Sequence, residues 1–209
     1  MTTLPLKLVG TLARVPLTHG PDISHYETGI DFHAMRAGGI DRVICKATEG
    51  TGYTDPTYLD NYTRAKSVGL VVFAYVFLQP GNTTRQLSHF SDTTHLVPGD
   101  GQPIVDAETQ GLGRSDTFQA LRDLEMRGFR PILYASLSFW RDVLLSPLAW
   151  PLWLAAYRPD LPALPDGLTL FGWQHTDQGT CPGVPRPVDM SYYYGDLNSY
   201  IIGGQRREL

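Results

Sequence analysis

Short apolar runs alternate with helical patterns along most of this chain, and that alternation restricts the possible folds more than any other feature. Strands are predicted at 20–24, 42–47, 70–78, 103–108, 130–135, 152–156, 168–174 and 188–190. Helices are predicted at 28–37, 55–69, 83–95, 115–128 and 139–145. Strands that alternate with helices in this way indicate βαβ units and a largely parallel sheet.

The number of strands and the late loops define the architecture further. Seven or eight strands in about 190 residues predict a compact, partly incomplete β/α barrel of the TIM-barrel type. The Pro- and Gly-rich stretches 159–167 and 177–187 have no helical period, so helices are expected to be missing from the C-terminal part. No linker or repeat is visible, which predicts a single domain at 19–209 after an N-terminal extension at 1–18.

Composition and residue spacing argue against several functions. The net charge of −4 gives no basic surface for nucleic acid. No apolar run approaches 18 residues, so no membrane span is expected, and 1–20 lacks the apolar core of a signal peptide. The six histidines have no metal-ligand spacing, so no metal or other cofactor is expected. Cys45 and Cys181 lie far apart and are predicted to be free.

The strand at 103–108 ends in two carboxylates, Asp106 and Glu108. Side chains of a strand alternate between its faces, so these two point the same way, with Cα atoms roughly 6.5–7 Å apart. Two neighbouring carboxyls whose pKa values differ supply an acid together with a base or charge stabiliser, as glycoside hydrolysis requires. The structural alternative is a pair of acids at a loop edge that caps the next helix.

Further acids and aromatic residues are predicted at the same end of the barrel. In parallel β/α folds the carboxyl ends of the strands meet at one mouth. The acids expected there are Asp22, Asp106, Glu108 and Asp189. The aromatic residues expected there are Tyr75, Phe77, Tyr134, Trp153, Tyr157 and Trp173. Aromatic faces stack on the apolar faces of sugars, so an acidic mouth with aromatic walls favours a polysaccharide substrate.

Eight ordered segments carry a resemblance to a known family. They are Gly20-Pro21-Asp22-Ile23-Ser24, the run from Ile44 to Tyr53, Phe73-Ala74-Tyr75-Val76-Phe77, Asp106-Ala107-Glu108, Pro131-Ile132-Leu133-Tyr134, the run from Leu152 to Tyr157, Gly172-Trp173-Gln174-His175-Thr176 and Val188-Asp189. In this order they resemble the glycoside hydrolase family 25 muramidases, the lysozymes of bacterial autolysins and phage endolysins. The resemblance implies a flattened β/α barrel with some helices missing.

The resemblance also implies an activity and residue roles. The expected reaction is hydrolysis of the β-1,4 bond between N-acetylmuramic acid and N-acetylglucosamine in peptidoglycan. Glu108 matches the family's general acid, Asp106 its partner carboxylate, and Asp22 and Asp189 two further acids of the cleft. The resemblance favours retention of configuration with participation of the substrate's 2-acetamido group. From the residues alone, Asp106 could act by attack, by its charge or by orienting that group, and retention or inversion stays open.

Glu108 is expected to have a raised pKa, because of its enclosed position and the charge of Asp106. The residues expected to bind substrate are Tyr75, Tyr134, Trp153, Lys46, Tyr53 and Gln174. For Lys46, a salt bridge with Glu49 that holds the loop at 50–52 is an equally good interpretation. Many relatives carry a histidine at the position of Val76 and a tyrosine at that of His175, so two polar contacts differ here.

Two other functions compete with a muramidase. One is a non-catalytic glycan-binding or virion structural protein on the same barrel, and the other is a chitinase-like hydrolase. Without a signal peptide, the chain is expected to be a phage lysin that is made in the host cytoplasm and reaches the wall through a holin or in the virion. An exported bacterial wall hydrolase is the alternative. Peptidoglycan is the expected partner, and a monomer is expected.

Overall fold

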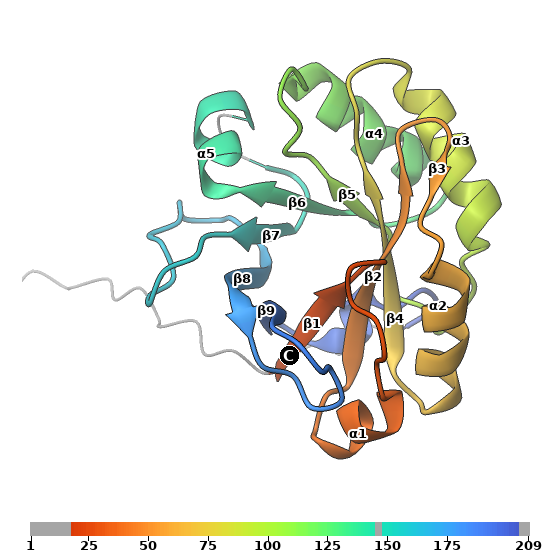
Figure 1. Cartoon of the computed structure of the whole chain (residues 1–209). Helices are drawn as coiled ribbons and strands as arrows, with labels where there is room; N and C mark the ends of the chain where they lie inside the picture. The colour runs from red at the N-terminus through yellow and green to blue at the C-terminus, as the bar shows by residue number, and fades with distance from the viewer. Residues whose placement is uncertain (1–17, 145–147, 205–209) are drawn as a thin grey trace, which may run out of the picture.

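A computed structural model describes residues 18–144 and 148–204, so all but the last residue of the extension expected at 1–18 lies outside the described residues. Eight strands form a closed barrel in the order β1-β9-β8-β7-β6-β5-β4-β2, because β1 also pairs with β2 (Figure 1). These strands are β1 (Thr18–Ile23), β2 (Arg42–Glu49), β4 (Val71–Phe77), β5 (Ile104–Asp106), β6 (Ile132–Ser136), β7 (Leu152–Ala155), β8 (Leu170–Gly179) and β9 (Val188–Tyr193). The predicted β/α barrel is therefore confirmed.

The barrel is parallel except around its last strand. Neighbouring strands from β1 through β2, β4, β5, β6 and β7 to β8 are parallel, whereas β9 runs antiparallel to both β8 and β1. A two-residue strand that the sequence did not indicate, β3 (Tyr53–Thr54), pairs antiparallel with the end of β2. This pairing keeps the chain after β2 at the mouth of the barrel.

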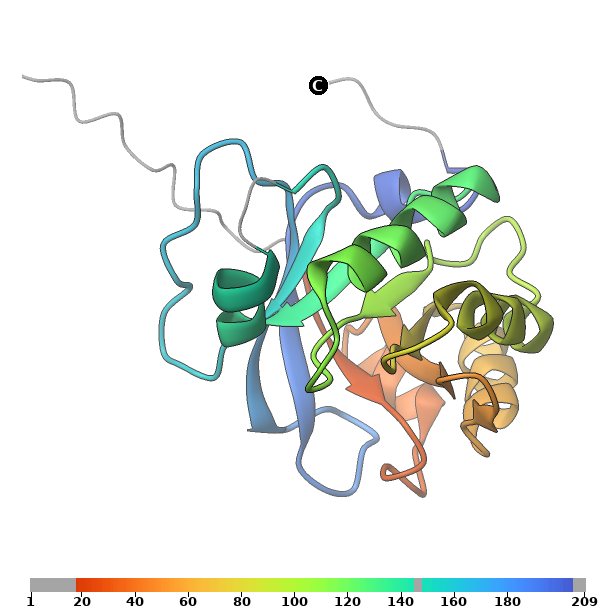
Figure 2. The same cartoon turned by 90° about the horizontal axis from the view of Figure 1, so that it is seen from above.

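In the described chain, helices surround the barrel from β1 to β6, whereas no helix follows β7 or β8 (Figure 2). They are α1 (Phe32–Ala37), α2 (Tyr58–Ser67), α3 (Thr83–Thr94), α4 (Arg114–Met126) and α5 (Leu137–Phe139), which continues as a π-helix over Trp140–Leu144. Between β7 and β9 the described chain contains no helix, and only a short 3-10 helix (Leu197–Tyr200) follows β9. The expected loss of helices from the C-terminal part is confirmed.

Two helices begin later than the sequence patterns predict. The helix expected at 28–37 starts only at Phe32, because Gly29 has a φ of 73° and the Asp31 carboxylate caps the helix by accepting from the Ala34 N–H. In α2 the N-cap is Thr57 rather than Asp55. The Asp55 carboxylate instead accepts hydrogen bonds from the Thr57 backbone and hydroxyl.

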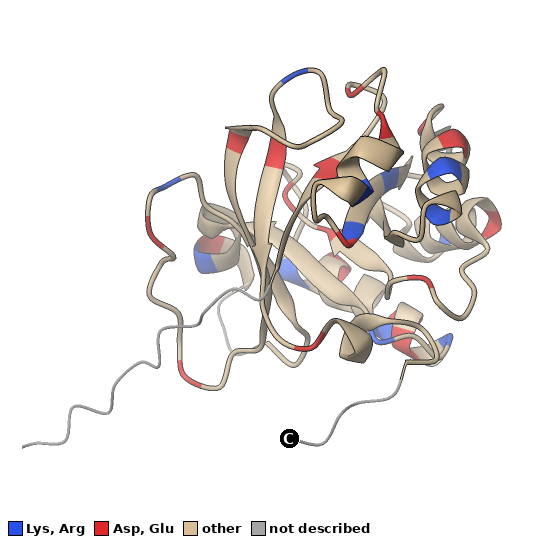
Figure 3. Cartoon of the chain, turned by 90° about the horizontal axis from the view of Figure 1, so that it is seen from below, with Lys and Arg blue, Asp and Glu red and all other residues tan. Residues whose placement is uncertain are grey.

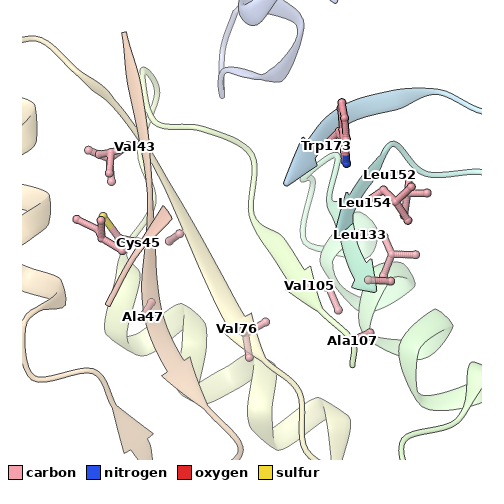
Figure 4. Packing of buried hydrophobic residues seen from close by; sticks show 14 of the residues in the cluster. Val43, Cys45, Ala47, Val76, Val105, Ala107, Leu133, Leu152, Leu154 and Trp173 are labelled. Atoms are coloured by element: carbon pink, nitrogen blue, oxygen red, sulfur yellow. The ribbon is translucent and has the colours of Figure 1, made fainter. Parts of the chain in front are cut away.

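The alternation of the strands separates two apolar clusters. An outer cluster lies between the strands and the helices and contains Val43, Cys45, Val76, Leu154 and Trp173 (Figure 4). An inner cluster fills the barrel with Ile44, Phe73, Ile104, Ile132, Tyr134, Trp153, Ala155, Phe171, Tyr193 and Tyr200. The predicted free cysteines are confirmed, and both thiols are buried. The packed interior leaves the mouth of the barrel as the place for a site.

Candidate active site

Inward-facing side chains at the mouth surround a cavity of about 160 Å³. Its lining residues are Asp22, Lys46, Tyr75, Phe77, Asp106, Glu108, Tyr134, Trp153, Tyr157, Gln174 and Asp189. The cavity therefore brings together all four predicted acids and five of the six residues expected to bind substrate; Tyr53 is the exception. Figure 3 shows acidic residues on several barrel strands, whereas the helices carry charges of both signs.

Asp189 reaches the mouth for a different reason than the parallel pattern suggested. It is the second residue of β9, near the strand's N-terminal end. Because β9 runs antiparallel, this end lies beside the carboxyl end of β1, and Asp189 pairs in register with Asp22. The expectation that Asp189 follows a parallel strand is thus wrong, although its predicted position at the mouth is right.

A buried amide fixes one side of the cavity. The Gln174 side chain donates from Nε2 to both carboxylate oxygens of Asp22, at 3.0 and 3.1 Å. Its Oε1 accepts hydrogen bonds from the hydroxyls of Tyr134 at 2.9 Å and Tyr157 at 3.0 Å. Every oxygen and nitrogen of the amide is therefore bonded to protein, so Gln174 positions Asp22, Tyr134 and Tyr157.

The acids of this side have altered pKa values. Burial and the neighbouring Asp189 raise the pKa of Asp22 well above its usual value. Burial, Glu27 and Asp177 raise the pKa of Asp189 to about 6, although its hydrogen bond with Asp22 lowers it. Two carboxyls this close cannot both carry a full charge easily, so the pair favours a shared proton.

The predicted acid pair projects from the opposite side. The segment after β5 stays extended because the Leu78 and Ala107 N–H groups donate to the Asp106 and Tyr134 carbonyls. Ala107 faces the outer cluster, so Asp106 and Glu108 share the inner face, as predicted. Asp106 is buried, and its Oδ1 accepts no hydrogen bond within the described residues. Glu108 lies at the rim of the cavity and is exposed to solvent.

Both carboxyls of the pair have raised pKa values, for different reasons. Burial and then the charge of Glu108 raise the pKa of Asp106, while Lys46 lowers it. For Glu108 the cause is burial alone. The expectation that the Asp106 charge raises the pKa of Glu108 is therefore corrected, because the repulsion acts on the more deeply buried member.

Lys46 forms the salt bridge considered for it and also lines the cavity, while its contact with substrate stays a prediction. Its ammonium forms a 2.7 Å salt bridge with Glu49, whose second oxygen accepts from Gln79 at 2.9 Å. The same ammonium lies 4.8 Å from the centre of the Phe77 ring on the cavity wall. Tyr53 lies farther out, with its ring centre 5.6 Å from the Lys46 nitrogen. The Lys46 ammonium therefore lies between Phe77 on the cavity wall and Tyr53 outside the cavity.

Three other sequence-based expectations change with the structure. Trp173 does not reach the mouth; it packs in the outer cluster and donates to the Ala156 carbonyl at 2.8 Å. Val76 faces the same outer cluster, so its replacement of a histidine does not remove a cavity contact. His175 stacks on Tyr192 with ring centres 4.4 Å apart, outside the cavity, and burial lowers its pKa.

Some contacts at and beside the cavity had no signal in the sequence. Trp153 is oriented by a 2.9 Å hydrogen bond from its Nε1 to the Ser191 hydroxyl, which comes from β9. Beside the rim, His25 bonds the buried Asp55 carboxylate at 2.9 Å. The partners are 38 and 30 residues apart, and only the alternation of Asp189, Ser191 and Tyr193 in β9 could have suggested the first contact.

The described residues, 18–144 and 148–204, also bear on membranes and metals. None of the helices they form combines the length and apolar character that a bilayer crossing requires. In the same part of the chain, no three histidine, cysteine or acidic side chains are grouped so that they could hold a metal ion.

The barrel and its acidic cavity define the class of protein as a glycoside hydrolase of the lysozyme type. The family model of glycosyl hydrolases family 25 matches residues 21–184, and the chain belongs to this family. The earlier resemblance is thereby confirmed.

Named relatives agree with this assignment. The chain is 31% identical over 192 residues to the autolytic lysozyme of Clostridium acetobutylicum, covering 88% of this chain and 57% of that protein. The fold is similar to that of the bacterial lysozyme from Streptomyces coelicolor, with a TM-score of 0.78 at 25% identity over 87% of this chain and 94% of the other. It is also similar to the CTP1L endolysin, with a TM-score of 0.77 at 25% identity over 91% and 71%.

Proposed function

We propose that this protein is an N-acetylmuramidase that cleaves the β-1,4 bond between N-acetylmuramic acid and N-acetylglucosamine in peptidoglycan. The observation that carries the proposal is the placement of Asp106 and Glu108 on one wall of a cavity, with Asp22 and Asp189 among the other lining residues. The names of the relatives support the substrate, since they are lysozymes and an endolysin.

Glu108 acts as the general acid in this mechanism. Burial raises its pKa, so the protonated form persists at a higher pH than for a free glutamate. Its position at the rim lets it approach the glycosidic oxygen of a polymer lying across the mouth. As the bond from that oxygen to C1 breaks, Glu108 gives its proton to the leaving oxygen and becomes a carboxylate.

Asp106 assists the substrate's 2-acetamido group. Its unpartnered Oδ1 is an acceptor for the acetamido N–H, and the nearby Lys46 favours the charged form of Asp106. With the N–H held there, the acetamido carbonyl oxygen attacks C1 and forms a cyclic oxazolinium as the leaving sugar departs. A water then attacks C1 from the other face and gives its proton to Glu108, which reopens the ring with net retention.

Asp22 and Asp189 stabilise this sequence from the opposite wall. Gln174 holds Asp22 in place with two hydrogen bonds, and Asp189 lies next to it in register. The pair presents negative charge toward the positive charge that develops on the sugar ring. It also offers oxygens that hold the attacking water.

We further propose a phage lysin as the biological setting. The similarity to the CTP1L endolysin over 91% of this chain supports this setting. A bacterial wall hydrolase is the alternative, which the clostridial autolytic lysozyme favours. Lysis of host cells from inside on co-expression with a holin, and not from outside on addition to intact cells, supports the phage lysin.

Product mass spectrometry tests the reaction. Purified peptidoglycan is digested with the wild type and with Glu108→Gln, and the products are reduced with borohydride. Reduced muramic acid ends from the wild type, lost in Glu108→Gln, are the expected result. Reduced glucosamine ends would assign the cleavage to the other bond, and digestion of chitin instead would favour a chitinase-like hydrolase.

A folded wild type that binds peptidoglycan and releases no fragments would contradict catalysis altogether. It would leave the non-catalytic glycan-binding protein as the function. Retention is tested separately, by following the anomer of the first product by NMR before it equilibrates. The α anomer as first product would contradict the acetamido mechanism.

A further inference from the structure

A row of aromatic side chains leads from the cavity to the outer surface. It starts at Phe77 on the cavity wall and passes the Lys46 ammonium, which lies 4.8 Å from the Phe77 ring and 5.6 Å from the Tyr53 ring. The Tyr53 ring lies 6.1 Å from that of His25, which lies 4.1 Å from that of Tyr26. The mechanism proposed above does not use the outer three rings.

The outer rings are exposed although they are large and partly apolar. Tyr26 is 68% exposed and Tyr53 is 40% exposed. Among the described residues with large exposed hydrophobic side chains, the only other aromatic one is Tyr157, which lines the cavity. Exposed aromatic residues that gather beside a site indicate a binding surface.

Hydrogen bonds anchor the His25 and Tyr53 rings and the backbone of Tyr26 before any ligand binds. The Asp55 carboxylate accepts from both the backbone and the ring of His25, at 3.0 and 2.9 Å. The Tyr53 hydroxyl bonds the same ring at 3.2 Å, and Arg186 donates to the Tyr26 carbonyl. A rigid aromatic surface binds with little loss of conformational entropy.

The position of these rings matches a polymer that crosses the mouth. In the closed barrel, β7 and β2 are separated by three strands in either direction, so they lie on opposite sides. Tyr157 follows β7, whereas Tyr53 lies in β3, which pairs with β2. A glycan strand that contacts Tyr157 and passes Asp106 and Glu108 therefore leaves the cavity over Tyr53.

We propose that His25, Tyr53 and Tyr26 form a platform that binds sugar rings of the glycan strand beyond the cleaved bond. This inference rests on the muramidase function proposed above. The neutral sugar face is favoured over the acidic stem peptide, because the platform continues from a cavity lined by four acids. Lys46 and His25 already face Glu49 and Asp55, and Arg186 donates to the Tyr26 carbonyl.

The test compares long and short substrates for the Tyr26→Ala variant. The ratio of kcat/KM on peptidoglycan strands to kcat/KM on a soluble muramyl tetrasaccharide is expected to fall about tenfold. Tyr26→Trp keeps an aromatic face and should restore the ratio. Met126→Ala removes a side chain of similar exposure on α4, away from the mouth, and should leave the ratio unchanged.

A binding measurement separates this inference from the proposed function. In the Glu108→Gln background, the Kd for purified glycan strands should rise about tenfold with Tyr26→Ala, whether or not the wild type cleaves them. An unchanged Kd and an unchanged ratio would overturn the platform. Loss of binding only to strands that still carry their peptides would assign the surface to the stem peptide instead.

Discussion

Gln174 has no charge, yet at the scale of single residues it arranges the charges of the cavity. Its amide nitrogen faces Asp22, while its oxygen faces two tyrosine hydroxyls. Because each hydroxyl donates, the amide cannot turn over without placing two donors against its own NH₂ group. The tyrosines therefore fix the orientation that Asp22 requires.

Tyr134→Phe and Tyr157→Phe should each weaken this arrangement slightly, and the double variant should weaken it much more. One hydroxyl is enough to hold the amide, so each single change is expected to cost about 1 kcal/mol of unfolding free energy. Loss of both allows the amide to turn, and kcat should fall by more than the product of the single effects. Urea unfolding and kcat on peptidoglycan are measured for both single variants and the double variant. Strictly additive effects of the two substitutions would contradict the orienting role of the tyrosines.

Asp106 illustrates a conflict between stability and activity at one residue. A buried carboxyl with an unpartnered oxygen destabilises the fold when it is charged. Asp106→Asn should therefore raise the unfolding free energy at pH 7.5 by about 1 kcal/mol, while kcat falls at least about 100-fold. The exposed Asp160→Asn serves as control and should change neither value. A less stable Asp106→Asn would show that the buried carboxylate is better satisfied than its contacts indicate.

The residues of the site differ in how far the sequence could predict them. The spacing of Asp106 and Glu108 places both on one face of a strand, because the rule involves only neighbouring residues. The bonds of Gln174 to Asp22 join residues 152 positions apart, and no local pattern encodes them. The predicted position of Trp173 was wrong because the alternation of side chains along a strand defines two faces and does not show which face points into the barrel.

At the scale of elements, β9 decides how the barrel closes. Apolar runs predicted most strands, since a strand buried on both faces reads as a continuous hydrophobic segment. The direction of β9 depends on its pairing with β1 and β8, which the sequence pattern does not contain. The close packing of β7, β8 and β9 depends in turn on Gly172, where an added Cβ would lie 2.9 Å from both Trp153 and Tyr193.

Gly172→Ala should therefore disturb these three strands. The methyl group is expected to displace the Trp153 ring and to lower the unfolding free energy by about 1–3 kcal/mol. Denaturant unfolding followed by tryptophan fluorescence measures both effects. Gly52→Ala is the matched control, because its Cβ would meet nothing within 4 Å, and it should unfold like the wild type. Equal midpoints for the two variants would contradict the packing argument.

At the scale of the whole molecule, the acidic mouth makes stability depend on pH. A carboxyl whose folded pKa is raised contributes stability below its unfolded pKa, and that stability is lost as the pH rises through the folded pKa. For Asp189 this stability is lost over the pH range from its usual pKa near 4 to its raised pKa of about 6. Asp22 and Asp106 shift in the same direction.

The wild type should therefore be more stable at pH 4.5 than at pH 7. Of this difference, Asp189 is expected to contribute about 1–3 kcal/mol, which Asp189→Asn should remove. Urea unfolding at a series of pH values at constant ionic strength gives the curve. A wild-type curve that rises between pH 4.5 and 7, or an unchanged slope in Asp189→Asn, would contradict the raised pKa.

The in-register pairing of Asp22 with Asp189 joins the first and the last strand of the barrel. During synthesis, the chain can therefore fold its helical side while the acid from β9 is still on the ribosome. The cleft receives its fourth acid, Asp189, only when β9 is inserted. The set of acids is therefore complete only once the barrel is closed. Copies that end before β9 would lack Asp189 and would therefore carry an incomplete cleft.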